Sequence, residues 1–260
     1  MAYNPPRKYN LFDPTSSKPF SLSRGKIENF LKCPRCFYLD RRLGIDRPPL
    51  PGFSLNVAVD QLMKKEFDIL RKSKKRHELM KKFKIDAVPF DHPDIMVWRD
   101  DIKKFEGANF LHKQTNLKIC GIIDDVWINP TSKLHIVDYK STSTSREISL
   151  EDEYKQTYKK QIELYQWIFR QNGFKVSDIG YFVFANAKKT PEKFDGVLEF
   201  EMQIISHKGD DSWVEKTVFE IKKCLMSDTL PSSTERCEYC AYRKASKPFD
   251  QKAIQGSLGI

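Results

Sequence analysis

Two apolar segments joined by a short turn constrain the fold of this chain most strongly. Residues 117–128 and 134–140 are strand-length and rich in Ile and Val, and Asn-Pro-Thr-Ser occupies positions 129–132 between them. Apolar runs of this length on either side of a turn predict an antiparallel β-hairpin. We therefore expect a largely buried hairpin within residues 117–141.

Two acidic residues lie symmetrically in this hairpin. Asp124 and Asp138 are equidistant from Thr131, the expected centre of the turn. In that register their Cβ atoms would be about 5 Å apart across the strands, whereas a slip of one residue would move the two side chains to opposite faces. Like charges this close, among apolar side chains, destabilise a sheet unless a cation or a proton lies between them. Because carboxylate oxygens suit magnesium or manganese, the pattern predicts a divalent-cation site here.

Lys140 adds a positive charge to the same place. It lies two residues beyond Asp138 and therefore on the same strand face, while Tyr139 points the other way. A lysine beside a metal can position or help to activate a water, or neutralise the charge on a transferring phosphoryl group. An acid-X-Lys tripeptide occurs five times in this chain, but only this one follows an apolar strand and has a matching acid on a preceding strand.

The net charge is concentrated in one window. The 260-residue chain has a formal net charge of +10, and residues 64–84 hold ten Lys and Arg against three acids. Interleaved apolar residues predict amphipathic helices over residues 54–85 with a basic outer face. Such a face would attract polyanions such as nucleic acid, although it would also suit an ordinary solvated helix surface.

The remaining elements complete an α/β pattern. Helix-period or strand-like apolar spacing predicts a helix from Ser23 to the Cys33-Pro34 step, a motif helix over 151–172, strands over 179–185 and 197–205, and a helix over 211–226. This order favours an α/β fold around a mixed sheet. We expect a single domain over residues 21–245, with a flexible arm at 1–20 and a flexible tail at 246–260.

The cysteines indicate a metal site. With neither a membrane-length apolar run nor a secretion signal at the start, we expect a soluble cytoplasmic protein, in which disulfides are rare. Cysteine pairs of the form Cys-X-X-Cys occur at 33–36 and 237–240. The thiolates of Cys33, Cys36, Cys237 and Cys240 would form one closed site for zinc or for an iron–sulfur cluster. Cys120 and Cys224 have no such partner, and we expect them in the core.

An ordered set of motifs resembles a known family. Gly121-Ile122-Ile123-Asp124, then Ile136-Val137-Asp138-Tyr139-Lys140, then Gln161 and Tyr165 in the one Gln-X-X-X-Tyr match of the chain, occur in the order typical of the PD-(D/E)XK nucleases of the RecB and CRISPR-adaptation branch. Residues 23–39 are similar to the opening helix and cysteine of that branch. The resemblance implies a restriction-endonuclease-like central mixed sheet flanked by helices, with the N- and C-terminal segments joined at the four-cysteine site.

The resemblance also implies roles for single residues. Asp124 and Asp138 would bind magnesium or manganese, the Tyr139 carbonyl would complete the coordination sphere, and Lys140 would assist the attacking water. Gln161 and Tyr165 would orient Lys140 or the DNA backbone. Family members place a metal-binding histidine in the helix before the sheet. Asp60 stands at that position here, and an aspartate can also ligate these metals, so we expect it to be a third carboxylate ligand.

The cysteine pattern departs from the family in its spacing. Related nucleases bind a four-iron cluster through one cysteine near the start and three near the end, whereas this chain has two and two. The resemblance favours the four-iron cluster, and the spacing suits zinc equally well. In either case the expected role is structural, holding the two ends of the chain together.

These observations predict a metal-dependent DNA nuclease that hydrolyses phosphodiester bonds with a magnesium- or manganese-activated water. Its expected setting is DNA repair, recombination or CRISPR-type DNA processing. The substrate would be DNA, single-stranded or with frayed ends, and a helicase or an integrase is the expected partner. The alternative is a catalytically inactive nucleic-acid-binding module with a structural zinc or iron–sulfur site, which the Asp60 departure favours. A zinc-ribbon protein that binds other proteins would leave the hairpin acids unexplained.

Overall fold

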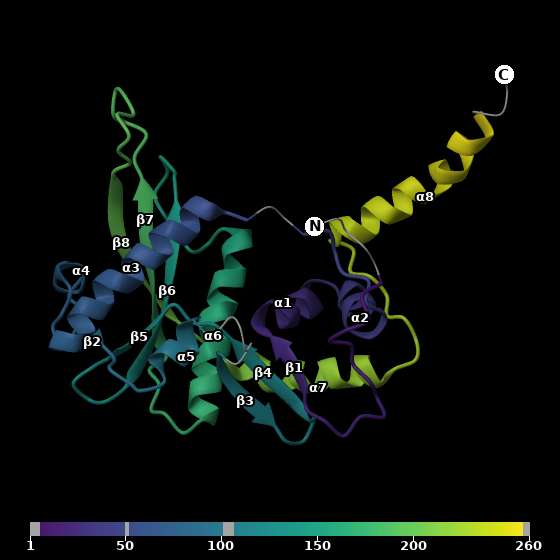
Figure 1. Ribbon diagram of the computed structural model, residues 1–260, viewed down its shortest axis with the longest axis horizontal. Coiled ribbons are helices and arrows are strands. Elements are labelled where there is room, and N and C mark those ends of the chain that lie inside the picture. Colours follow the sequence, from purple (N-terminus) through teal and green to yellow (C-terminus); the bar gives the residue numbers. More distant parts are fainter. Residues whose placement is uncertain (1–5, 50–51, 101–106, 257–260) are drawn as a thin grey trace. The chain divides into compact units, whose positions relative to one another are not determined.

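The computed structural model describes residues 6–49, 52–100 and 107–256 (Figure 1). The chain divides into two compact units. One unit comprises Met1–Leu50, Lys113–Leu117 and Glu215–Ile260, and the other comprises Pro51–His112 and Lys118–Val214. We call them the cysteine unit and the sheet unit, and each is described by itself.

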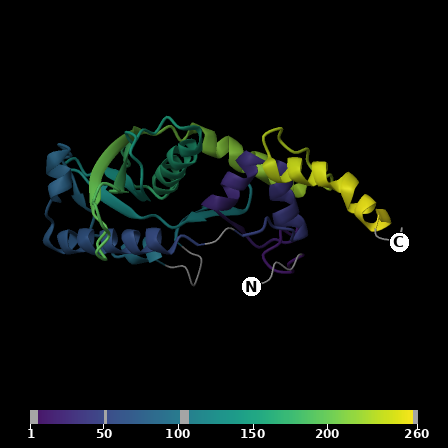
Figure 2. The same ribbon diagram turned by 90° about the horizontal axis from the view of Figure 1, so that it is seen from above.

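A five-stranded mixed sheet forms the centre of the sheet unit. Its strand order is β2-β5-β6-β7-β8, in which β6 and β7 are parallel and the other neighbours antiparallel. The strands are β2 (Val88–Pro89), β5 (Asp125–Ile128), β6 (Leu134–Thr142), β7 (Ile179–Ala187) and β8 (Phe200–Lys208). Helices α3 (Ser54–Ser73) and α6 (Gln156–Gln171) cover opposite faces of this sheet (Figures 1 and 2). The predicted mixed sheet flanked by helices is thus confirmed.

The two faces of β6 carry different side chains because successive residues of a strand alternate in direction. Val137 and Tyr139 face α3, where they pack with Phe67 and Trp127 in a buried apolar cluster. On the opposite face of the sheet, α6 lies so close to the neighbouring strand β7 that a Cβ on Gly180 of β7 would lie 2.5 Å from the Ile162 side chain. Only glycine fits at that position.

The predicted hairpin register is confirmed. Asp125 pairs with Val137 and Ile128 with Leu134, so the β5–β6 hairpin is centred on Thr131. The single strand expected over 117–128 is wrong, however. The structure has β4 (Leu117–Gly121), which belongs to a second sheet with β3 (Ala108–His112), and then β5.

Tertiary hydrogen bonds account for the break between β4 and β5. The Tyr165 hydroxyl donates to the Ile122 carbonyl at 2.7 Å, and the Ile123 N–H donates to the Trp98 carbonyl at 3.1 Å. These bonds take residues 122 and 123 out of the ladder. Gly121 is required beside them, since a Cβ there would lie 2.6 Å from the Tyr165 ring.

Shorter helices complete the sheet unit. The basic window predicted to be helical forms α3 and α4, and the motif helix begins with the 3-10 turn η1 before α6. The bounds of these short elements are α4 (Glu78–Lys82), α5 (Ile95–Asp100) and η1 (Glu153–Lys155). The predicted strands at 179–185 and 197–205 are observed as β7 and β8, with β8 starting three residues later than expected.

The cysteine unit is mainly helical. Helix α1 ends at Lys32 and Pro34 opens α2, as predicted, and Ser23 occupies the N-cap position of α1 without a capping hydrogen bond from its side chain. Its elements are β1 (Phe20–Ser23), α1 (Arg24–Lys32), α2 (Pro34–Leu43), most of α7 (Ser212–Met226) and α8 (Glu238–Gly256). Among the described residues no helix has both the length and the apolar character that a membrane crossing would need.

Parts of the expected arm and tail have secondary structure or tertiary contacts within residues 6–20 and 246–256. Arg7 and Phe12 lie in the segment expected to be a flexible arm, yet Arg7 is ion-paired with Asp40 and Phe12 is buried. The segment expected to be a flexible tail continues α8, with Pro248 inside the helix.

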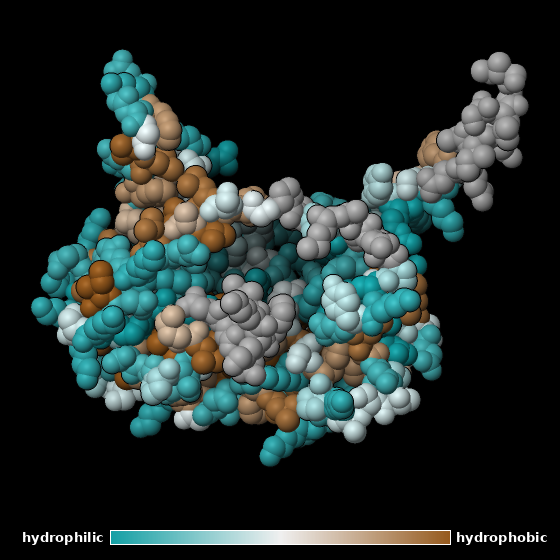
Figure 3. Space-filling view, viewed as in Figure 1, coloured by the Kyte–Doolittle hydropathy of each residue, from teal (hydrophilic) through white to brown (hydrophobic). Residues whose placement is uncertain are grey.

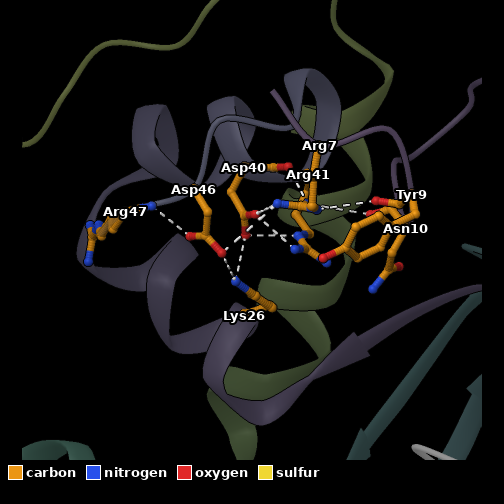
Figure 4. A network of polar contacts seen from close by, with 8 residues as sticks. All are labelled: Arg7, Tyr9, Asn10, Lys26, Asp40, Arg41, Asp46 and Arg47. Carbon is orange, nitrogen blue, oxygen red and sulfur yellow. Dashed lines mark hydrogen bonds and ion pairs between the residues drawn. The ribbon is translucent and has the colours of Figure 1, made fainter. Parts of the chain in front are cut away.

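Asp40 organises a charged network in the cysteine unit (Figure 4). Its carboxylate is buried and pairs with Arg7, with Arg41 at 2.8 Å and with Lys26 at 2.9 Å. Lys26 also pairs with Asp46 at 2.8 Å. Burial alone would raise the pKa of Asp40, but hydrogen bonds from Arg41 and Lys26 outweigh it and lower this pKa to about 2.

Candidate active site

Asp124 and Asp138 meet at the open end of the hairpin. The confirmed register continues one residue beyond β5, which brings Asp124 opposite Asp138. The Tyr139 N–H donates a 2.8 Å hydrogen bond to Asp124 Oδ2, so the backbone of β6 holds the Asp124 carboxylate beside Asp138. The predicted cross-strand pair of acids is therefore present.

Asp138 is buried, and one of its two carboxylate oxygens is ion-paired with Lys140. Its side chain is 2% exposed, and its other carboxylate oxygen, Oδ1, accepts no hydrogen bond among the described residues. Burial and the charge of Asp124 raise the pKa of Asp138 to about 7, against the opposing effect of Lys140. A buried carboxylate with an unsatisfied oxygen is costly, which is a common property of functional sites.

Lys140 lies on the same strand face as Asp138, as predicted. Its Nζ contacts Asp138 and lies 4.7 Å from the centre of the Tyr158 ring, which projects from α6. Burial would lower the pKa of Lys140, but the charges of Asp138 and Asp124 raise it. The lysine is therefore a fixed cation beside the two carboxylates.

Helix α3 brings Asp60 toward this pair. Lys64 Nζ lies 2.9 Å from Asp60 Oδ2 and 3.7 Å from Asp124 Oδ1, so the lysine bridges the two acids. Burial and the charge of Asp124 together raise the pKa of Asp60. The sequence reasoning missed Lys64 as a site residue, although its spacing of four from Asp60 is the spacing of a helical ion pair.

The Gln-X-X-X-Tyr residues lie on α6 and are both buried. The hydroxyl of Tyr165 bonds the Ile122 carbonyl, two residues before Asp124, and so helps to fix the chain where it enters the site. Gln161 lies one turn earlier on α6. The α6 residue whose ring lies beside the Lys140 ammonium group is Tyr158.

Part of the predicted basic face turns inward. Arg71 is 4% exposed and pairs with Asp125, which is fully buried, and with Asp68 at 3.0 Å. Asp125 also accepts a 2.8 Å hydrogen bond from the Tyr139 hydroxyl, on the sheet face opposite Asp138. Arg71 and Lys64 therefore serve the interior of the sheet unit and do not add to a nucleic-acid surface, because buried charges need partners.

The donor set of this site suits a hard divalent cation. Asp60, Asp124 and Asp138 offer only carboxylate oxygens, the ligands that magnesium and manganese prefer. Asp138 Oδ1 accepts no hydrogen bond from a described residue, whereas Oδ2 is held in the ion pair with Lys140. The three carboxylates do not converge within 4.8 Å as the cysteines do, and the ammonium groups of Lys64 and Lys140 pair with them instead.

Four thiols converge in the cysteine unit. Within the described part of the chain, Cys33, Cys36, Cys237 and Cys240 form the one set of three or more potential ligands whose atoms all lie within 4.8 Å of one another. The Sγ atom of Cys36 lies 3.6 Å from the Sγ atoms of both Cys237 and Cys240, and Cys33 Sγ lies 3.9 Å from Cys240 Sγ. Both predicted Cys-X-X-Cys pairs therefore join in one metal-binding group, which links the N- and C-terminal segments.

The surroundings of the thiols favour the thiolate of Cys33, whereas burial raises the pKa of Cys36 and of Cys240. Burial would raise the pKa of Cys33, but backbone N–H groups of Cys36 and Thr234 outweigh it and lower this pKa to about 7. Arg47 Nη2 lies 4.0 Å from Cys237 Sγ. A nearby guanidinium and backbone donors stabilise the charged form that binds metals. Of the other cysteines, Cys120 is buried as predicted and Cys224 is half-buried.

A mixed sheet with helices on both faces, and an Asp…Asp-X-Lys cluster at the end of its central hairpin, define the restriction-endonuclease-like class of α/β proteins. In agreement, the family model of the PD-(D/E)XK nuclease superfamily matches residues 54–245, which is most of the chain. The chain belongs to this superfamily. No curated protein matches it.

Proposed function

We propose that this protein is a metal-dependent nuclease of the RecB-like and CRISPR-adaptation branch that hydrolyses phosphodiester bonds in DNA. The observation that carries the proposal is the Asp138 carboxylate, which is buried between Asp124 and Lys140 and whose Oδ1 accepts no hydrogen bond from a described residue. Membership of the nuclease superfamily supports phosphodiester hydrolysis, and the Gln161 and Tyr165 pair supports the branch.

The chain's own residues would divide the work. Asp124, Asp138, Asp60 and the Tyr139 carbonyl would hold magnesium or manganese. The bound ion would supply an activated water and would polarise the scissile phosphate. Lys140, held between Asp138 and the Tyr158 ring, would orient that water and stabilise negative charge on the phosphoryl oxygens.

The four cysteines would hold one tetrahedral ion of the zinc type. Four thiolates around a single ion at about 2.3 Å would have their sulfurs about 3.8 Å apart. The Sγ–Sγ distances from Cys240 to Cys33 and Cys36, and from Cys36 to Cys237, are 3.6–3.9 Å. A four-iron cluster places an iron and bridging sulfides between the thiolates and so spreads them farther. The sulfur spacing thus favours zinc over the cluster that the resemblance implied.

A second candidate is a nucleic-acid-binding module without catalytic activity. The Asp60–Lys64 ion pair favours it, because the Lys64 ammonium group already contacts two of the three carboxylates. In that case the lysine would replace the divalent cation, and binding without cleavage would follow.

A cleavage assay distinguishes the two candidates. Wild-type protein is incubated with end-labelled single-stranded DNA, double-stranded DNA and RNA, in manganese or magnesium. We expect cleavage of DNA that falls at least about 100-fold in Asp138→Asn and Lys140→Ala. Glu220→Gln, in another acid-X-Lys tripeptide, is the matched control and should cleave at the wild-type rate. Binding without cleavage in either metal would select the second candidate.

A further inference from the structure

A groove opens at the carboxyl ends of β6 and β7. It encloses about 870 Å³ and is lined by the segment 144–148 after β6, by residues 186–190 at the end of β7, and by Glu201 and Gln203 of β8. All of these residues belong to the sheet unit. Nothing in the proposed hydrolysis uses this groove.

The groove is a built feature because one residue fixes its two walls. Asn186 Oδ1 accepts from the Thr144 N–H at 2.9 Å, and Asn186 Nδ2 donates to the Thr144 carbonyl at 3.0 Å. Ile148 is buried and anchors the far end of the segment. These contacts hold the segment after β6 against β7.

Two cations of the groove have no acidic partner. Arg146 and Lys189 are exposed, and neither forms an ion pair with any described residue, whereas Lys188 pairs with Glu199 at 3.0 Å. Glu147 and Glu201 also line the groove, so Arg146 and Lys189 are its candidate contacts for phosphate groups. The tip beyond the groove, between β7 and β8, is hydrophilic in Figure 3.

The groove lies just beyond the end of β6, the strand that carries Asp138 and Lys140 of the candidate site. Thr142 pairs with Asn186 and Lys140 with Phe184, so groove and site lie along the same two parallel strands. Thr144 lies two residues beyond the end of β6 and four beyond Lys140, so at about 3.3 Å per residue of extended chain it lies at most about 13 Å from Lys140. A bound polynucleotide extends over several nucleotides, so a strand cut at Lys140 would reach the groove.

We propose that this groove binds the phosphodiester backbone of a single nucleic-acid strand next to the candidate active site, with Arg146 and Lys189 as phosphate-binding residues. The proposal rests on the proposed function. The groove has the volume of a small-molecule pocket, about 300–1,000 Å³. A short single-stranded segment fits such a space.

The test measures binding separately from cleavage. A fluorescent 15-nucleotide single strand is titrated in calcium at several salt concentrations with wild-type protein, Arg146→Ala, Lys189→Ala and the double variant. The control is Lys133→Ala/Lys175→Ala, which removes two exposed lysines at the opposite end of the strands. Cleavage by the wild type in manganese is assayed in parallel.

We expect the double variant to bind the single strand about 10-fold more weakly, and its plot of log Kd against log salt to be shallower by about 1.4, since each phosphate contact with a single strand contributes about 0.7. The control should change Kd less than 2-fold. Equal binding by the double variant and the wild type would contradict the proposal that the groove binds the strand. Cleavage by the wild type in the parallel assay would still support the proposed nuclease activity. Binding that depends on Arg146 and Lys189 without any cleavage would contradict the proposed nuclease activity and support the groove as a binding site.

Discussion

Asp124 Oδ2 accepts a 2.8 Å hydrogen bond from the backbone N–H of Tyr139. This bond joins the end of one hairpin strand to the middle of the next and fixes a carboxylate beside Asp138. The same residue would therefore serve the fold and the chemistry, and substitution can separate the two roles.

Asp124→Asn retains an oxygen that can accept from Tyr139 and removes the charge. We expect it to fold with wild-type stability and to lose DNA cleavage at least about 100-fold. Asp124→Ala should lose cleavage equally and should also lose about 1–2 kcal/mol of unfolding free energy, because the Tyr139 N–H loses its partner. Urea denaturation and a cleavage assay measure the two effects. Wild-type cleavage by the Asn variant would remove Asp124 from the site.

Tyr165→Phe removes the hydroxyl that bonds the Ile122 carbonyl at the break between β4 and β5. The carbonyl would lose its donor, so we expect a loss of about 1–2 kcal/mol in urea denaturation. We also expect a weaker manganese affinity, because the chain that leads into Asp124 loses a fixed point. Phe169→Leu, on the same helix, is a control that should lower stability without lowering metal affinity. Unchanged metal affinity in Tyr165→Phe would restrict Tyr165 to packing.

The cysteine site should contain one zinc per chain and no iron, and the purified protein should be colourless. We expect Cys240→Ser to lose that zinc and to lower the Tm, because bound metal stabilises the folded state. Cys224→Ser, outside the group, should retain both the zinc and the Tm. Elemental analysis and calorimetric melting give the answers. Stoichiometric iron with visible absorption would contradict the assignment of a single zinc ion and would support a four-iron cluster instead.

The Asp40 network should make stability depend on acid pH. The pKa of Asp40 is lowered to about 2, so its ionised form stabilises the fold at every pH above its unfolded pKa of about 4. That contribution, on the order of 2 kcal/mol, should disappear as the pH falls from about 4 to about 2. Asp40→Asn should be less stable at pH 7 and should lose less stability over that window. If the free energies of unfolding of the wild type and Asp40→Asn change with pH in the same way, the ion pairs of Asp40 contribute nothing to stability.

The sequence was sufficient to predict the hairpin register and the meeting of Asp124 with Asp138, because both depend on a local turn and on alternation along a strand. The break in residues 117–128 was not predictable from that segment. It depends on Tyr165 and Trp98, which only the tertiary fold brings to it.

The basic window shows a second limit. A run of lysines and arginines looks like a solvated face, yet Lys64 and Arg71 point inward to Asp124 and Asp125. A signal was available, since both residues have helical spacing from the buried Phe67. Each of them also pairs with an acid of its own helix, Asp60 or Asp68, but Asp124 and Asp125 come from the hairpin, which the spacing alone does not identify.

A calorimetric titration with manganese, using protein that holds zinc at the cysteine site and no other metal, tests the central claim most directly. We expect the wild type to bind manganese with measurable heat and Asp138→Asn to show none, because the buried Asp138 carboxylate is the principal ligand. The cysteine site is kept saturated with zinc in both proteins, so that it contributes no heat. Equal manganese binding by the wild type and Asp138→Asn would contradict the proposed active site.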